Sequence, residues 1–318
     1  MEFITKKTSE LTQEELQQLS DLFEEVFERP STVEGFLSSY TSNYLGGSFH
    51  TLIIKDGKIV GANSLVPIEY YVDDKKMLFI NSGGTMISKH SRGLENFYDM
   101  ISESYRYLKE NGYGAYVGFP NDNSYPLFIG TKLMKDIGKM YTYMLPYRVG
   151  GVKKKLKLLN PLSKLFCQCY SVVSGWFASD KVVSFKIHKA HETFDDYRYK
   201  KNNGNYVSLN IGRGKAYYRI ANHDDVRTAF IVDVTEKSAK NFQRTVREIL
   251  KREKKNMDLI LYVGNLPFSG HGLIRIPRKY EPKNFYFTGH IFDEKAIDKK
   301  MFYDFNSWDV NLSNYDLI

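Results

Sequence analysis

Two cysteines, Cys167 and Cys169, are the residues whose type and spacing first suggest chemistry, because paired thiolates can bind a metal ion. No second cysteine or histidine pair lies at ligand spacing from them, so we predict no metal site. The sequence also contains no Walker loop, no G-x-S-x-G elbow, no H-E-x-x-H motif and no dinucleotide fingerprint. Its chemistry must therefore come from residues without one of these motifs.

Two polar loops are the most informative places in the chain. The first, Ser88-Lys89-His90-Ser91-Arg92-Gly93, follows an apolar run and precedes a helical pattern. The second, Pro120-Asn121-Asp122-Asn123-Ser124-Tyr125-Pro126, directly follows the apolar run 115–119. Loops held by rigid elements carry a large share of binding and catalytic groups. We therefore expect the functional residues at these two loops.

The elements that precede the first loop are well signalled. Thr12 and Glu15 form a capping box, and apolar residues at helical spacing follow until Pro30. A short helix is predicted over 33–40. Strands are predicted over 49–54, 59–72 and 77–87, with tight turns at 56–57 and 73–76. Three antiparallel strands joined by hairpins therefore lead into the first loop.

A helix follows the first loop, because apolar residues from Phe97 to Leu108 mark one face and Gly112 ends it. The run 115–119 is apolar enough to be a central strand, and a further helix and a strand over 139–145 follow. Gly83-Gly84 predicts a β-bulge that opens a gap beside the strand 77–87. The alternative is that these glycines only ease close packing.

The second half repeats the order of elements without a visible repeat of residues. Strands are predicted over 206–211, 215–221 and 227–234, a long helix over 237–255, and strands over 257–264, 272–276 and 284–292.

Length and composition indicate a folded chain of about two domains at about 150 residues each. The chain has 318 residues, of which 42% are hydrophobic, 26% charged and 15% aromatic. Its 24 tyrosines favour half-buried sheet faces. The longest apolar runs fall far short of the ~20 residues of a membrane-spanning helix. The first residues lack the order of a secretion signal, so we expect a cytoplasmic protein.

The charge balance, with 45 basic and 37 acidic residues and a net charge of +8, is compatible with nucleic acid, anionic lipid or a polyanionic cofactor. Lysine clusters at 153–155 and 251–255 are typical of solvated faces. The stretch 152–177 reads as a basic amphipathic segment. It either makes peripheral contact with a membrane or packs between domains with its lysines in water.

The order of elements, with Arg92-Gly93 at the first loop, resembles the GCN5-related N-acetyltransferase superfamily over residues 1–145. The resemblance implies an α+β (mixed α/β) fold of two such domains, each a mostly antiparallel twisted sheet flanked by helices. Residues 1–145 would bind acyl-CoA, residues 146–185 would form an amphipathic linker, and residues 186–318 would be a degenerate second copy.

In that family an Arg/Gln-x-x-Gly-x-Gly/Ala loop wraps the pyrophosphate of acetyl-CoA, because backbone amides and a helix N-terminus bind anions. Here Arg92 matches the first position, whereas Glu95 and Phe97 stand where a glycine and a small residue are usual. Glu95 is then a first-turn charge that replaces a phosphate instead of binding one. The cofactor-binding residues implied are Met86, Ile87, Ser88, Arg92, Gly93, Leu94, Glu95, Asn96, Asn121 and Asn123.

The run from Gly118 to Phe128 resembles a subgroup with a Phe-Pro-Asn-x-x-Ser signature, whose members often occur among genes for cell-surface polysaccharides. This implies an amino sugar or its nucleotide conjugate as acceptor. Phe128 holds the place of the tyrosine that acts as general acid in many members, so Tyr125, the nearest phenol, is the substitute candidate or an ordinary packed side chain.

The implied reaction is direct attack of a small-molecule amine on the thioester, with amides at 86–88 stabilising the oxyanion. Glu69 and Asp122 are the candidate general bases. Glu24, Glu25, His50 and His90 are further candidates, and each of these side chains also has an ordinary structural interpretation.

Three functions stay open from the sequence. The leading one is an acyl-CoA-dependent N-acetyltransferase. The second is an aminoacyl transferase that uses charged tRNA, and only in this case is nucleic acid a partner. The third is a non-catalytic module that keeps the fold for binding. The oligomeric state is left open.

Overall fold

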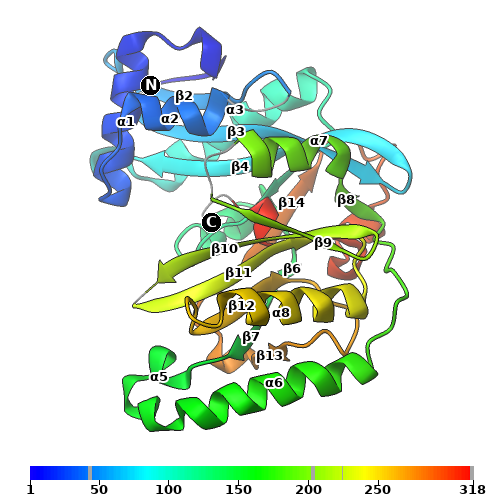
Figure 1. Ribbon diagram of the computed structural model, residues 1–318. Coiled ribbons are helices and arrows are strands. Elements are labelled where there is room, and N and C mark those ends of the chain that lie inside the picture. Colours follow the sequence, from blue (N-terminus) through cyan, green and yellow to red (C-terminus); the bar gives the residue numbers. More distant parts are fainter. Residues whose placement is uncertain (42–44, 202–204, 224, 316–318) are drawn as a thin grey trace. The chain divides into compact units, whose positions relative to one another are not determined.

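The structure is a computed structural model that describes residues 1–41, 45–201, 205–223 and 225–315 (Figure 1). The chain forms two compact units, each built from three segments. Unit 1 contains Met1–Lys139, Lys186–Asn202 and Phe285–Ser307, and unit 2 contains Met140–Phe185, Asn203–Asn284 and Trp308–Ile318. These interleaved units differ from the sequential division at 145 and 185 that the sequence suggested, because strands from both halves of the chain complete each sheet.

The sheet of unit 1 has eight strands, and its main path runs in the order β1-β2-β3-β4-β5-β14-β6, with β8 paired to β3. The strands are β1 (Glu2–Lys7), β2 (Phe49–Lys55), β3 (Lys58–Val72), β4 (Lys75–Ile87), β5 (Ala115–Gly118), β6 (Lys135–Lys139), β8 (Ile187–Lys189) and β14 (Tyr286–Ile291). The three predicted hairpin strands are confirmed as β2, β3 and β4. β1 and β6 were not predicted, because their many polar residues obscure the alternation of apolar and polar residues that is typical of a strand.

The two hairpins follow from their turn residues. Asp56 and Gly57 both have positive φ, 50° and 76°, and they separate the paired residues Lys55 and Lys58. This is the two-residue turn whose twist matches that of the strands. A second two-residue turn separates Val72 from Lys75, with Asp73 at φ 42°. Local sequence therefore fixes the register of the central strands.

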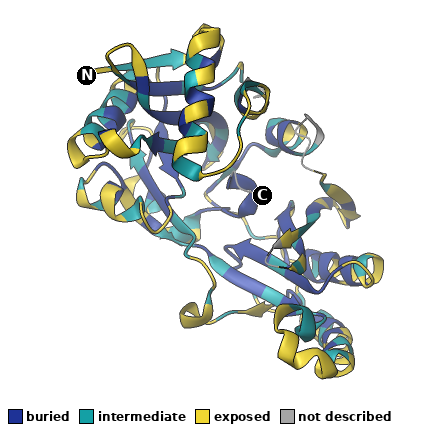
Figure 2. Cartoon of the chain, turned by 90° about the vertical axis from the view of Figure 1, so that its left-hand side faces the viewer, coloured by how far each residue is buried: buried dark blue, intermediate teal, exposed yellow. Residues whose placement is uncertain are grey.

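Helices cover both faces of this sheet. α1 (Gln13–Phe27) and α2 (Val33–Thr41) pack on one face, and α3 (Leu94–Glu110) and α4 (Tyr125–Gly130) pack on the other. The predicted capping box of α1 is confirmed: the Glu15 amide donates to Thr12 Oγ1 at 3.2 Å and the Thr12 amide donates to Glu15 at 2.9 Å. Figure 2 shows burial concentrated in the strands, with the helices exposing their outer sides.

The sheet of unit 2 has six strands in the order β13-β7-β12-β11-β10-β9. They are β7 (Tyr141–Pro146), β9 (Val207–Ile211), β10 (Gly214–His223), β11 (Val226–Val234), β12 (Leu259–Gly264) and β13 (Ile274–Arg275). α8 (Ala239–Glu253) covers one face of this sheet, and α6 (Asn160–Trp176) packs beside α8. Short helices are α5 (Val149–Val152), α7 (His191–Asp195) and α9 (Lys299–Phe302).

Both units share one arrangement. In each, antiparallel hairpin strands lead into a helix, and the strand after the helix pairs in parallel with the last hairpin strand: β5 with β4 in unit 1 and β12 with β11 in unit 2. The predicted mixed α/β fold with two mostly antiparallel sheets flanked by helices is confirmed. β14 had been assigned to the second domain, but it lies between β5 and β6 in unit 1. Among the described residues, no helix is long and apolar enough to cross a bilayer.

Candidate active site

The candidate site of unit 1 lies where β4 and β5 part. The two strands pair from Phe79 with Ala115 to Ser82 with Gly118, where β5 ends. β4 continues to Ile87, and among the described residues no strand pairs with the β5-facing edge of this extension. Strand edges present backbone N–H and C=O groups, so this edge offers them to a ligand.

The predicted bulge in β4 is confirmed beside this open edge. Ala62 pairs with Met86 and Ser64 with Gly83, so β4 has one more residue than β3 between these two pairs. Gly84, within the bulge, has φ 56°, a conformation that favours glycine. An added Cβ at Gly84 would also lie 2.8 Å from Tyr40 Oη. The bulge therefore depends on a residue without a side chain.

Replacing Gly84 with alanine is expected to destabilise the chain by roughly 1–3 kcal/mol, because the left-handed conformation and the approach to Tyr40 both disfavour a Cβ. Urea unfolding measures the change. Gly93→Ala is the matched control, because Gly93 has extended φ 173° and its added Cβ meets no described atom within 4 Å. Equal stability of the two variants would contradict the strain at Gly84.

A buried network of polar side chains lies beside the gap between β4 and β5. Its central residue, Asn63, was not among the predicted site residues. Asn63 Oδ1 accepts from Ser82 Oγ at 3.1 Å and from Thr85 Oγ1 at 2.9 Å, so it holds both sides of the bulge. Asn63 Nδ2 donates to Tyr116 Oη at 3.1 Å and to Ser104 Oγ at 3.2 Å. The polar pair Asn63-Ser64 within the mostly apolar predicted strand 59–72 was the sequence signal that could have identified this residue.

The first loop is anchored to α1 by Glu25. The Glu25 carboxylate accepts from Ser88 Oγ and from the Lys89 amide, both at 2.9 Å, and the Lys89 bond is the main reason that the pKa of Glu25 is lowered. The Ser88 amide donates to Val60 O at 2.8 Å. Glu25 therefore positions the loop, and the Ser88 amide already has a partner. Alternate residues of a strand direct their amides to the same side, so the Met86 amide faces β3 like that of Ser88, and of the predicted oxyanion group only the Ile87 amide faces the open edge.

The N-terminus of α3 has amides and a nearby arginine that could bind an anion. Its N-cap is Gly93, and within the described chain no side chain caps this end. The first amides of a helix have no partner within the helix. Arg92 is exposed, with its Nε bonded to Ile87 O at 3.3 Å. Glu95 is also exposed, so its carboxylate shares this end with any bound anion.

Two other residues of this loop region have structural contacts. Asn96 Nδ2 donates to Ser91 O at 2.8 Å, which closes the turn between the loop and α3. Phe97 is buried and meets Phe128 edge to face with ring centroids 4.9 Å apart. Both phenylalanines therefore belong to the core between α3, α4 and the sheet.

The second loop builds its own turn. Asn121 Oδ1 accepts from the amides of Asn123 and Ser124 at 2.9 and 3.0 Å, and the Asn121 amide donates to Ser124 Oγ at 3.1 Å. The Asn-x-x-Ser signature thus shapes the turn that begins α4. The side chain of Asn121 is used within this turn.

Tyr125 and Asp122 each meet a partner from a distant segment. The Tyr125 ring stacks on Tyr286 of β14 with centroids 3.9 Å apart. Its hydroxyl bonds Asp136, and burial followed by this carboxylate raises the pKa of Tyr125. Asp122 accepts from the hydroxyl of Tyr286. Tyr286 and Asp136 were missed because nothing in the local pattern links them to the loop.

The other candidate bases lie elsewhere. Glu69 accepts from Thr193 Oγ1 at 2.9 Å and pairs with Lys76 at 3.8 Å. It lies five residues beyond Ser64 on β3, about 17 Å along the strand at about 3.3 Å per residue. Glu69 is therefore not brought to the gap. Glu24 and His90 are exposed, and neither belongs to the Asn63 network.

His50 is fully buried, with Nε2 2.9 Å from Thr8 Oγ1 and Nδ1 3.0 Å from Ser64 Oγ. Burial lowers its pKa from 6.5 to about 3, so it is neutral in the folded chain. This argues against a role as a general base near neutral pH.

The same shift predicts a pH dependence. Below pH 6.5 the unfolded chain gains a proton at His50 that the folded chain does not accept until about pH 3, so stability falls as pH decreases between these values. His50 alone is expected to remove about 2 kcal/mol by about pH 5. Urea unfolding at neutral pH and near pH 5 tests this. The free energy of unfolding of His50→Gln is expected to depend less on pH than that of the wild type. An equal pH dependence in the two proteins would contradict the prediction. Buried His271, with its pKa lowered to about 4, adds to the slope in both proteins.

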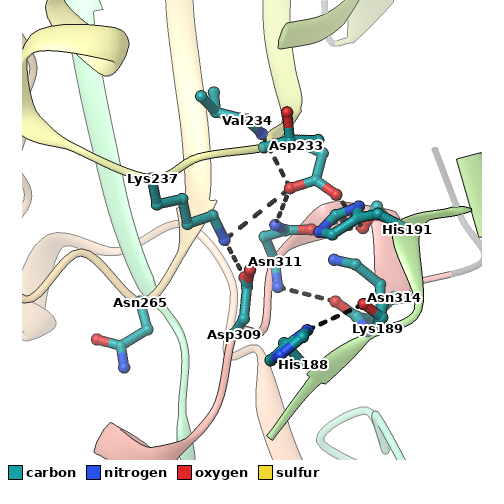
Figure 3. A network of polar contacts seen from close by, with 12 residues as sticks. His188, Lys189, His191, Asp233, Val234, Lys237, Asn265, Asp309, Asn311 and Asn314 are labelled. Atoms are coloured by element: carbon teal, nitrogen blue, oxygen red, sulfur yellow. Dashed lines mark hydrogen bonds and ion pairs between the residues drawn. The ribbon is translucent and has the colours of Figure 1, made fainter. Parts of the chain in front are cut away.

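In unit 2 the corresponding strand ends are occupied by the chain itself (Figure 3). β11 and β12 pair in parallel up to Ile231 and Tyr262. Beyond them, Asn311 forms a bridge with Gly264 and donates to Asp233 at 2.7 Å. This closes the ends of β11 and β12 with the C-terminal segment, which leaves unit 1 as the place for the candidate site.

A buried charge cluster holds that segment. Lys237 pairs with Asp309 of the segment and lies 3.9 Å from Asp233 at the end of β11. Ser313 Oγ also donates to Asp233, at 3.2 Å, and the Asn265 amide donates to Val310 O at 3.1 Å.

Comparison with known proteins defines the class of this site. Residues 7–128 match the model of the acetyltransferase (GNAT) domain family, a range that includes the open edge of β4, the bulge and both loops. This part of unit 1 is therefore similar to a GNAT acetyltransferase domain, and N-acetyl transfer is the activity that this match supports. No curated protein matches the chain.

Solved structures show the same fold over nearly the whole chain. A GCN5-related N-acetyltransferase from Anabaena variabilis ATCC 29413 is similar with a TM-score of 0.60 and 12% identity over 92% of this chain and 73% of that one. One from Kribbella flavida has a TM-score of 0.59 and 9% identity over 93% and 72%. A conserved protein of unknown function from Enterococcus faecalis V583, described as a probable N-acyltransferase, has a TM-score of 0.58 and 14% identity over 93% and 74%.

Proposed function

We propose that the chain is an acyl-CoA-dependent N-acetyltransferase whose acyl-CoA site is the open edge of β4 in unit 1. One observation carries this proposal: the extension of β4, whose β5-facing edge has no strand partner among the described residues, leads through an anchored loop into the start of α3 at Gly93. Acyl-CoA needs backbone amides beside its thioester and an anion site at its diphosphate. The edge of β4 followed by the start of α3 supplies both. Gly93, where an added Cβ meets only open space, leaves room at the anion site.

The residues of unit 1 then have distinct roles. Arg92 and the first amides of α3, from Leu94 to Asn96, bind the diphosphate. The amide of Ile87 polarises the carbonyl of the thioester, the activated acyl group that bound acetyl-CoA supplies. Asn63 acts as a positioning residue, because it fixes β4 on both sides of the bulge.

The Tyr125–Asp136 and Asp122–Tyr286 pairs are the candidates for proton transfer. The Tyr125 hydroxyl, whose pKa is raised above its usual 10, is protonated at neutral pH and so has a proton to donate. Asp122 is exposed and accepts from Tyr286, and its carboxylate is the candidate base toward an amine. We infer a small-molecule amine as the acceptor, with an amino sugar as the specific expectation.

A non-catalytic binding module is the second candidate, and the exposed carboxylate of Glu95 at the start of α3 favours it. A negative charge within about 4 Å of a phosphate costs on the order of 1 kcal/mol at an exposed site. Phe128 supports the same view, because it is buried in the core and offers no proton where many relatives of the family have a tyrosine.

Isothermal titration with coenzyme A separates the two candidates. We expect wild-type protein to bind one coenzyme A per chain, because the matching place in unit 2 is occupied by the C-terminal segment. Glu95→Gln should tighten binding about threefold to tenfold by removing the nearby charge. Glu110→Gln is the control at the other end of α3 and should have no effect. Binding by the Glu95 variant alone would favour the module, and absence of binding by both folded proteins would reject the acyl-CoA site.

A further inference from the structure

The helix α6 of unit 2 has an inverted burial pattern. Its buried stripe consists of small residues at helical spacing: Ser163, Cys167, Ser171 and Ser174. Its exposed stripe consists of large apolar residues: Leu162, Leu165, Phe166, Val172, Val173 and Trp176. At about 100° per residue these exposed side chains fall within an arc of about 120°. An ordinary surface helix buries its large apolar residues instead.

Specific contacts fix this orientation of α6. Ser163 Oγ and Cys167 Sγ both donate to Pro146 O at the end of β7, the latter at 3.2 Å. Gln243 of α8 donates to Ser171 O at 2.6 Å, and an added Cβ at Gly175 would lie 2.9 Å from the same Gln243 side chain. Small residues are therefore needed on the inner side. Turning the helix to bury its apolar stripe would break these bonds.

The apolar surface continues beyond both ends of the helix. Leu158 before α6 is 93% exposed, and Trp176 and Phe177 at its end are 75% and 74% exposed. We call the α6 face the set Leu158, Leu159, Leu162, Leu165, Phe166, Val173, Trp176 and Phe177. Soluble monomers seldom expose a continuous apolar surface of this kind without a partner.

Basic residues predominate around the α6 face, although Lys154 pairs with Asp225 at 3.7 Å. Residues 149–179 contain five lysines, Lys153, Lys154, Lys155, Lys157 and Lys164, and no aspartate or glutamate. Arg247 and Lys251 of the neighbouring α8, with its C-cap Lys254, line a depression together with Gln168 and Val172 of α6. A partner that fits this surface must therefore offer apolar groups bordered by negative charge.

We propose that the α6 face docks on an anionic phospholipid bilayer, with α6 lying in the plane of the interface. The apolar side chains would enter the boundary between headgroups and acyl chains, and the lysines would meet lipid phosphates. A second copy of this chain fits less well, because pairing two α6 faces brings lysine clusters of like charge together. RNA would use the lysines but not the aliphatic side chains.

Tryptophan fluorescence and vesicle sedimentation of the full chain test this proposal. The chain has two tryptophans: Trp176 is 75% exposed and Trp308 is fully buried. Vesicles of equimolar phosphatidylglycerol and phosphatidylcholine should sediment the protein and shift its emission to shorter wavelength, whereas pure phosphatidylcholine should bind far less. Trp176→Phe should abolish the shift while sedimentation remains.

The double variant Leu165→Ser/Phe166→Ser should lower the vesicle affinity at least tenfold, because two exposed apolar side chains no longer enter the bilayer. Tyr280→Ser is the control, since Tyr280 is 67% exposed in unit 2 but lies outside the α6 face. Circular dichroism checks that both variants are folded, and Trp176→Ser is a second test if the double variant is not. The proposal is overturned if wild-type protein fails to bind the anionic vesicles at low salt, or if folded α6 variants bind as tightly as wild type. It is equally overturned if light scattering shows that the protein forms a stable dimer through the α6 face, or if the protein binds tRNA but not the anionic vesicles.

Discussion

Replacing Asn63 with leucine is expected to destabilise the chain by roughly 2–4 kcal/mol, because one substitution removes four hydrogen bonds of a fully buried side chain. The side chains of leucine and asparagine have the same branched arrangement of non-hydrogen atoms, so the substitution leaves no cavity. The cost comes mainly from hydroxyl groups that lose a partner: Thr85, Ser104 and Tyr116 all bond to Asn63. Urea unfolding followed by circular dichroism measures the change.

The matched control is Asn111→Leu at the exposed end of α3, which removes one bond, from Asn111 Nδ2 to Tyr107 O at 2.8 Å, and should cost no more than about 1 kcal/mol. The two substitutions make the same chemical change in buried and exposed surroundings. A second readout separates positioning from stability: where Asn63→Leu is folded, its coenzyme A affinity should still fall, since the bulge loses its anchor to Ser82 and Thr85. Stability equal to that of the control would show that the network does not hold the gap.

Replacing Lys237 with methionine should have the largest effect in unit 2, on the order of 3–5 kcal/mol. The side chains of Lys237, Asp233 and Asp309 are 2%, 0% and 8% exposed, so the substitution removes an ammonium group from beside two buried carboxylates. The expected result is release of the C-terminal segment from the ends of β11 and β12. Trp308, which is fully buried at the start of this segment, should then shift its emission to longer wavelength.

Lys240→Met tests the same chemistry three residues away. Lys240 pairs with Asp180 at the surface, where an ion pair contributes at most about 1 kcal/mol. Adding Asp309→Asn to Lys237→Met should recover part of the lost stability, because it removes one of the two carboxylates. The interpretation fails if Lys237→Met and Lys240→Met unfold at the same urea concentration.

The sequence also predicted features of the site that depend on neighbouring residues. The bulge at Gly84 and the loop that leads from β4 into α3 were expected, and the resemblance placed Arg92 at this loop. The capture of the Lys89 amide by Glu25 was not expected, nor were the partners of Tyr125 and Asp122. These contacts join segments that are more than sixty residues apart in several cases, and no local pattern encodes such a meeting.

The sequence by itself determined the local elements of this protein. The capping box at Thr12 starts α1, and the positive φ angles at Asp56 and Gly57 set a hairpin register, because residues within a few positions of each other supply both partners of each bond. Only the tertiary structure decided which strands share a sheet. β14 joins unit 1 while β7 joins unit 2, and α6 turns its small residues inward. An apolar strand can pair with several edges and an apolar helix can bury either side, so the choice depends on contacts that form only when the whole chain has folded.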